Sequence, residues 1–116
     1  MKQKADLFLV QCRQNYFDEI FPADDTKKQT KGYRILKEIA QSYFDANQYD
    51  DFEDFFMEGQ YLIQLWAAHL ILEYGNPTEA LKQKCLLEIE KYSDNPLAPK
   101  VAVQEAAWLK SYTNKQ

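Results

Sequence analysis

Apolar side chains recur every three or four positions over most of the chain, which is the period of an α-helix. The first such stretch covers residues 4–21 and ends at Pro22, because proline cannot continue a helix. Residues 23–31 are polar and charged, and they predict a loop. A second helical stretch begins after Gly32 and carries its apolar face through Phe44.

The middle of the chain predicts two further helices after a turn at residues 47–50. Asp50 or Asp51 can cap a short helix over residues 52–58, where acids also suit the positive end of the helix dipole. Residues 60–74 are the most apolar part of the chain. A helix that is apolar nearly all round belongs in the centre of the core, and Gly75 follows it as a C-cap.

A capping box marks the start of the next helix. Asn76 can cap, Pro77 suits the first helical position, and Glu79 stands three residues after the cap. The sequence therefore predicts a helical hairpin over residues 60–92. The apolar positions expected on the inner face of its second helix are Ala80 or Leu81, Cys85, Leu86, Ile89 and Tyr92.

A last helix is predicted from Pro99 to about Tyr112. Its apolar positions include Val103, Ala106, Ala107 and Leu109, with Trp108 on an adjoining face. Residues 113–116 are polar and predict a frayed tail. The chain of 116 residues is thus expected to form a single all-α domain, residues 1–116, of about six helices.

The charges are strongly segregated, which bears on the partners. No lysine or arginine lies between Lys37 and Lys82, whereas this window holds nine of the 18 acids. The flanks hold the other nine acids and all 14 bases. Nucleic-acid binding needs cations against phosphate, so we expect no nucleic-acid partner and instead a protein partner with a basic surface.

Composition also bears on membrane association and on the state of the two cysteines. No stretch approaches the roughly 18 apolar residues that a membrane span needs, and Asp6 interrupts any signal-peptide core, so we expect a cytoplasmic protein without a membrane partner. Cys12 and Cys85 lack metal-site or redox-motif spacing and are expected to be reduced, buried thiols.

The residues offer little for catalysis. His69 is the only histidine, and Glu73 shares its helical face one turn later. This pair can be an acid–base couple, a structural pair or an interface contact, and the sequence favours the last two. Neither a metal motif nor a phosphate-binding glycine loop is present, so we expect no enzyme, no metal site and no cofactor.

The run Asp50-Asp51-Phe52-Glu53-Asp54-Phe55-Phe56 has two interpretations. It can be a docking patch that offers carboxylates to a basic partner, with aromatic anchors. It can equally be a helix start with solvated charges and phenylalanines turned into the core. The residues assigned to partner binding under the first interpretation are Asp45, Tyr49, Asp50, Asp51, Phe52, Glu53, Asp54 and Glu58.

The second half resembles a known family of helical repeats. Residues 65–75, LWAAHLILEYG, are similar to the first helix of a HEAT-type repeat, with paired alanines, a leucine and a turn glycine. Residues 76–92 resemble its second helix, and residues 101–109 the start of another unit. The resemblance covers about residues 55–112 and implies HEAT-like antiparallel hairpins.

Small acidic HEAT-like domains with this Trp-Ala-Ala signature are similar to proteins encoded beside bacterial polymorphic or contact-dependent growth inhibition toxins. The resemblance implies an immunity protein that binds and neutralises a cognate toxin, for example a nuclease. The alternative is a small helical-repeat adaptor or scaffold module for protein–protein interaction. Surplus apolar surface on the first helix also leaves room for a homodimer.

Overall fold

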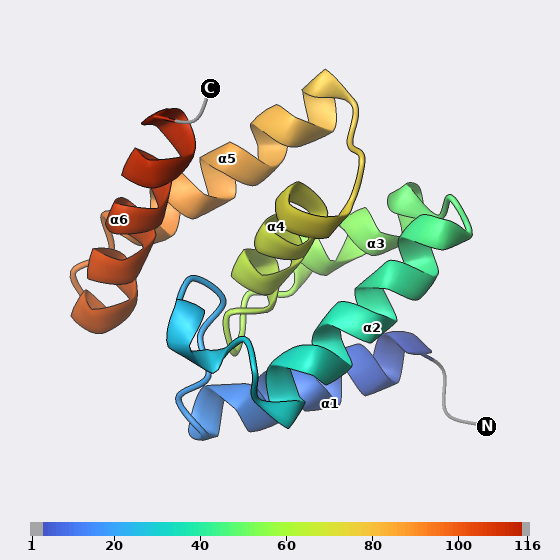
Figure 1. The fold of residues 1–116 in the computed structure, drawn as a ribbon, viewed down its shortest axis with the longest axis horizontal. Coiled ribbons are helices and arrows are strands. Elements are labelled where there is room, and N and C mark those ends of the chain that lie inside the picture. Colours follow the sequence, from blue (N-terminus) through green and yellow to red (C-terminus); the bar gives the residue numbers. More distant parts are fainter. Residues whose placement is uncertain (1–3, 115–116) are drawn as a thin grey trace.

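The computed structural model describes residues 4–114 and is all-helical over that range, as the sequence predicts (Figure 1). Six α-helices and two short 3₁₀ helices follow one another along the chain. They are α1 (Lys4–Phe17), η1 (Asp25–Lys27), α2 (Lys31–Asp45), α3 (Tyr49–Glu53), η2 (Asp54–Met57), α4 (Ile63–Tyr74), α5 (Glu79–Ser93) and α6 (Pro99–Asn114).

The helices surround α4. Figure 1 shows α1 and α2 along one edge of the molecule, α4 in the middle, and α5 and α6 on the other side. Helix α5 packs against α4, and α6 packs mainly against α5. Consecutive helices therefore form neighbouring pairs in the C-terminal half, while the HEAT-like character of these pairs stays a prediction.

The central position of α4 follows from its composition, as expected. Leu65, Trp66, Ala67 and Ala68 are fully buried. The two alanines let neighbouring helices approach closely, and the Trp66 ring fills space against Tyr33 of α2, with ring centroids 5.5 Å apart. None of the described helices is long and apolar enough to cross a membrane.

Helix α1 ends at Phe17, four residues earlier than the sequence predicted. The chain reverses at Glu19, whose φ of 57° is left-handed, and the Ile20 N–H donates to the Asn15 carbonyl at 2.8 Å. This reversal turns Ile20 and Phe21 into the core. Their apolar character extended the helical pattern past the true end of the helix.

Residues 23–31 were predicted as a polar loop, but the structure gives them local order. Asp24 caps η1 by accepting from the Thr26 N–H, and Thr30 caps α2 by accepting from the Tyr33 N–H. Side-chain caps of this kind satisfy the unpaired N–H groups at a helix start. The segment holds the Lys28 side chain against Glu73 of α4.

The short third helix begins earlier than predicted and is split in two. Helix α3 starts at Tyr49, and η2 continues it to Met57. Asp50 and Asp51 lie in the first turn of α3, so neither is the cap. Carboxylates in the first turn still stabilise the positive end of a helix.

Two further details correct the predicted helix ends. Thr78, and not Asn76, caps α5 by accepting from the Leu81 N–H at 3.2 Å. Helix α6 continues to Asn114, so residues 113 and 114 are helical and the predicted fraying is wrong for them; residues 115 and 116 lie outside the described part of the chain.

The inner face of α6 differs most from the prediction. Val103 is 70% exposed, and Ala106 and Ala107 are also exposed. The buried positions are Val101 and Glu105. The inner face thus contains a glutamate where the pattern predicted apolar residues. This glutamate faces His69 of α4.

Candidate functional site

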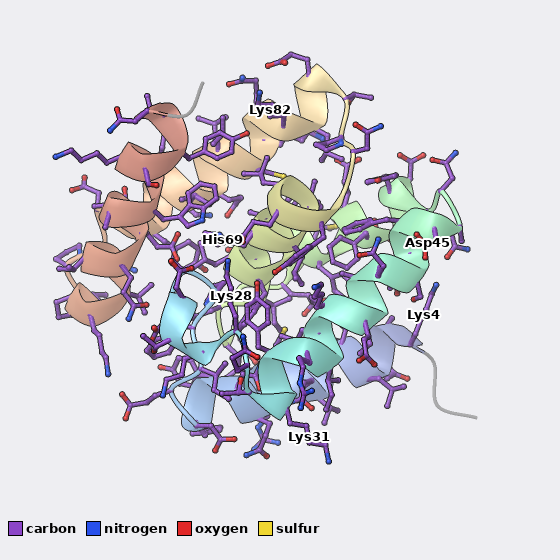
Figure 2. All side chains as sticks on the ribbon, in the orientation of Figure 1. Lys4, Lys28, Lys31, Asp45, His69 and Lys82 are labelled. Atoms are coloured by element: carbon purple, nitrogen blue, oxygen red, sulfur yellow. The ribbon has the colours of Figure 1, made fainter. Side chains whose placement is uncertain are left out.

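The predicted acidic site forms a ridge on the surface. We call Asp50, Asp51, Asp54 and Glu58 the acidic ridge; all four side chains are exposed and lie on α3, η2 and the residue after it. Asp45 is exposed as well, at the end of α2, where Figure 2 labels it. The structure therefore brings most of the predicted carboxylates together at one surface.

A groove of about 560 Å³ lies beside the acidic ridge, and we call it the Met57 groove. Met57 is 84% exposed and Leu87 of α5 is 65% exposed, so the groove offers apolar surface next to carboxylates. Its lining residues are Asp50, Glu53, Asp54, Phe56, Met57, Lys84, Leu87 and Glu88.

Two lysines limit the negative charge of the ridge. Lys84 Nζ lies 3.0 Å from Glu53 Oε1, so Glu53 is partly neutralised within the chain. Lys4 Nζ donates to Gln48 Oε1 at 2.9 Å and sits over the Tyr43 ring on the far side of the ridge. Exposed carboxylates still outnumber lysines here.

The two predicted aromatic anchors have structural roles. Phe52 is fully buried among Phe8, Tyr43, Phe44 and Phe55, with ring centroids 5.2–5.3 Å away, so its assignment as a partner-binding residue is wrong.

Tyr49 is half-buried, and both its ring and its hydroxyl contact other parts of the fold. Its ring stacks on Phe44 at 5.0 Å, and its hydroxyl accepts from the Asn76 N–H at 2.8 Å. Sequence reasoning missed Met57 and Leu87 as surface candidates. The only signal for Met57 was its place at the end of the acidic and aromatic run, which does not reveal exposure.

A buried polar network joins α4 to α6. His69 Nδ1 lies 3.2 Å from Glu73 Oε2, which confirms that the two share a helix face. His69 Nε2 lies 2.6 Å from Glu105 Oε1, and Lys28 Nζ donates to Glu73 Oε1 at 2.9 Å. Figure 2 shows Lys28 and His69 in the region between η1, α4 and α6. Lys28 and Glu105 come from distant parts of the chain and could not be paired with His69 by spacing.

Electrostatics favour alternating charges along this network. Burial disfavours a charged His69, but hydrogen bonds and charges from Glu105 and Glu73 outweigh it and raise the pKa of His69 above 6.5. Burial likewise opposes ionised Glu73, yet His69 and Lys28 lower the pKa of that carboxyl below 4.5. Lys28, Glu73, His69 and Glu105 thus alternate in sign when each is charged.

The network suits a structural role better than a chemical one. The His69 side chain is 2% exposed, both ring nitrogens face carboxylates, and the Trp108 ring lies edge-on at 4.6 Å. A general base needs a nitrogen within reach of a substrate proton. A cavity of about 600 Å³ adjoins Glu73 and Trp108, but His69 does not line it.

Neither thiol is placed for catalysis or metal binding. Cys12 and Cys85 are free and buried. Burial raises the pKa of Cys12 and raises that of Cys85 to about 12, so neither is a thiolate at neutral pH. Within residues 4–114, no group of three or more His, Cys, Asp and Glu side chains is arranged to hold a metal ion.

Comparisons with protein-family models, with curated proteins and with solved structures give no match to this chain. The resemblance to HEAT-like immunity proteins therefore rests on the sequence motifs alone. The function has to be argued from the acidic ridge and the surfaces beside it.

Proposed function

We propose that this chain is an immunity protein, which binds a bacterial toxin through the acidic ridge and thereby blocks it. The observation that carries the proposal is the exposed set of carboxylates on α3 and η2, in a window of the sequence without lysine or arginine. The resemblance of residues 65–75 to HEAT-type repeats of immunity proteins supports the same conclusion.

Charge favours a basic partner. Asp50, Asp51 and Asp54 project from two short helices and Glu58 follows the second; none of them forms an ion pair with a described residue. Unpaired exposed carboxylates attract a cationic surface and accelerate its association. A nuclease toxin carries such a surface in its substrate cleft, so the ridge would occupy the place of the nucleic-acid phosphates.

Apolar surface next to the ridge supports a protein partner. Charges at an interface mainly set the association rate and the specificity, whereas buried apolar anchors supply most of the affinity. Met57 and Leu87 provide exposed apolar side chains in the Met57 groove, directly beside Asp50 and Asp54. A basic toxin segment with an apolar side chain between its cations matches this arrangement.

The proposal is tested with the toxin domain encoded next to this chain's gene. We expect the two proteins to co-purify, and the toxin to lose activity at equimolar immunity protein. Absence of a complex at micromolar concentrations would contradict the proposal.

A charge-reversal variant then locates the surface. In Asp50→Lys/Asp51→Lys/Asp54→Lys, we expect the association rate at low salt to fall about ten- to a hundredfold, with the difference shrinking at high salt. The matched control is Glu79→Lys/Glu90→Lys/Asp94→Lys, which makes the same charge change at exposed positions elsewhere. Equal rates for the two variants would remove the ridge from the interface, and circular dichroism checks that both stay helical.

A further inference from the structure

A second surface of the molecule has a different character from the acidic ridge. A groove of about 790 Å³ lies between the end of α1, residues 59–62 before α4, and the turn that leads into α6. We call it the tyrosine groove, because Tyr16, Tyr61 and Tyr92 line it together with Leu97 and Pro99.

Exposed apolar side chains gather around the tyrosine groove. Leu97 is 92% exposed and Phe17 is 63% exposed, and the Phe17 and Tyr16 rings lie 5.9 and 5.6 Å from that of Tyr61. Val10, about two turns before Phe17 on α1, is 59% exposed. A cluster of large apolar side chains left in water marks an interaction surface.

The backbone around the tyrosine groove is strained. Glu19, Tyr61 and Leu62 have φ values of 57°, 52° and 59°, in the left-handed region that side chains with a Cβ rarely adopt. They are three of the four described non-glycine residues with positive φ. Residues held in this region are often found at functional surfaces.

The charges of this surface are balanced, unlike those of the acidic ridge. Glu19 Oε1 and Lys100 Nζ lie 2.8 Å apart on the rim, and both side chains are about two-thirds exposed. Arg13 lies over the Phe17 and Tyr61 rings at just under 6 Å. The chain carries a net charge of −4, so two copies repel each other unless they meet through a surface without net negative charge. The tyrosine groove is such a surface.

We propose that the tyrosine groove is a homodimer interface, in which two copies meet about a twofold axis. Leu97 of each copy packs on the Tyr16–Phe17–Tyr61 cluster of the other, and Glu19 of each copy faces Lys100 of the partner. A twofold interface must contain both halves of every contact on one patch. This surface meets that requirement, since it holds a protruding leucine and an aromatic cluster, and one acid and one base.

The first test is the oligomeric state between 1 and 500 µM by analytical ultracentrifugation. We expect a concentration-dependent dimer for the unmodified chain. The variant Phe17→Ser/Leu97→Ser should raise the dimer dissociation constant at least tenfold. Its control, Leu87→Ser/Val103→Ser, removes two apolar side chains that are 65% and 70% exposed outside the groove, and it should dimerise as the unmodified chain does. A monomer at 500 µM, or equal dimerisation of both variants, would overturn the proposal.

The second test uses charge exchange between copies. Glu19→Lys alone places lysine against Lys100 of the partner subunit, and Lys100→Glu alone places acid against acid, so each should dimerise at least several-fold more weakly. An equimolar mixture should regain dimers, because every contact across the axis is again acid against base.

An intramolecular role of the pair gives a different result, since mixing leaves the repulsion within each variant chain unchanged. Failure of the mixture to regain dimers, with both chains helical by circular dichroism, would therefore also overturn the proposal. Neither test involves a toxin, so their outcome is independent of the proposed immunity function.

Discussion

His69 Nε2 of α4 lies 2.6 Å from Glu105 Oε1 of α6, and both side chains are buried. This relationship explains why the inner face of α6 contains a glutamate. A buried carboxylate without a partner would cost several kcal/mol, whereas a carboxylate facing a protonated imidazole is compensated. The pair thus fixes which face of α6 turns inward.

Removing Glu105 should therefore destabilise the fold strongly. We expect Glu105→Ala to lower the free energy of unfolding by about 3–5 kcal/mol, because it leaves a buried imidazole without its main partner. Urea unfolding followed by circular dichroism measures this. The control Glu90→Ala, at an exposed position of α5, should change stability by about 0.5 kcal/mol or less. A Glu105→Ala effect of that small size would contradict the role assigned to the pair.

The His69 network should make stability depend on pH. The folded pKa of His69 is raised above 6.5, so its contribution is fully present below about pH 6.5 and is lost as pH rises through the folded value. The folded pKa of Glu73 is lowered below 4.5, so its contribution is present above pH 4.5 and is lost as pH falls through the folded value. Stability measured by urea unfolding should thus peak in weakly acidic solution and fall as the pH rises above about 6.5.

The variant His69→Gln is the control for this pH dependence. His69 is the only histidine of the chain, so the decline above about pH 6.5 should flatten in the variant. The slope for one proton is at most about 1.4 kcal/mol per pH unit. An equal decline in both proteins would assign it to another group.

Two glycines should respond in opposite ways to alanine. A Cβ on Gly32 would collide with the Asn15 amide, whose Nδ2 donates to the Gly32 carbonyl at 3.1 Å. We expect Gly32→Ala to cost about 1–3 kcal/mol through this overpacking between α1 and α2. A Cβ on Gly59 meets nothing within 4 Å, so Gly59→Ala should be neutral or stabilise by about 0.4–1 kcal/mol. Thermal unfolding distinguishes them, and similar effects at both sites would be inconsistent with this packing.

The two thiols should be inert in the folded protein. Cys12 and Cys85 are fully buried, and burial raises the pKa of both, to about 12 for Cys85. Since the thiolate is the reactive form, a thiol reagent such as DTNB should label neither at pH 7.5 and both in denaturant. Fast labelling of one thiol in native buffer would show that its helix opens readily.

Local signals in the sequence predicted much of the fold. The apolar segment at residues 60–74 and Pro99 at the head of the last helix led directly to α4 and to the start of α6. Helix ends were less predictable. Ile20 and Phe21 keep the apolar pattern going after α1 has ended, because the chain turns them into the core. Thr78 replaces Asn76 as the cap of α5, while the Asn76 N–H donates to the Tyr49 hydroxyl.

The candidate site was also predictable only in part. Charge segregation along the sequence was enough to place carboxylates around Asp50, since three exposed ones fall on two adjoining short helices and a fourth, Glu58, directly follows them. The sequence did not indicate which large apolar residues would be exposed beside these carboxylates. Phe52 turned into the core and Met57 did not, and that choice depends on the packing of α1 and α2 around residues 52–55.

By itself, the sequence determined an all-α chain with an apolar central helix and an acidic middle segment without lysine, because helix period and charge are local properties. Only the tertiary structure decided that Glu105 meets His69, that Lys28 meets Glu73, and that Leu97 and Tyr61 line one groove. These pairs join residues up to 45 positions apart. Their meeting depends on how whole helices pack, which no spacing within one helix can reveal.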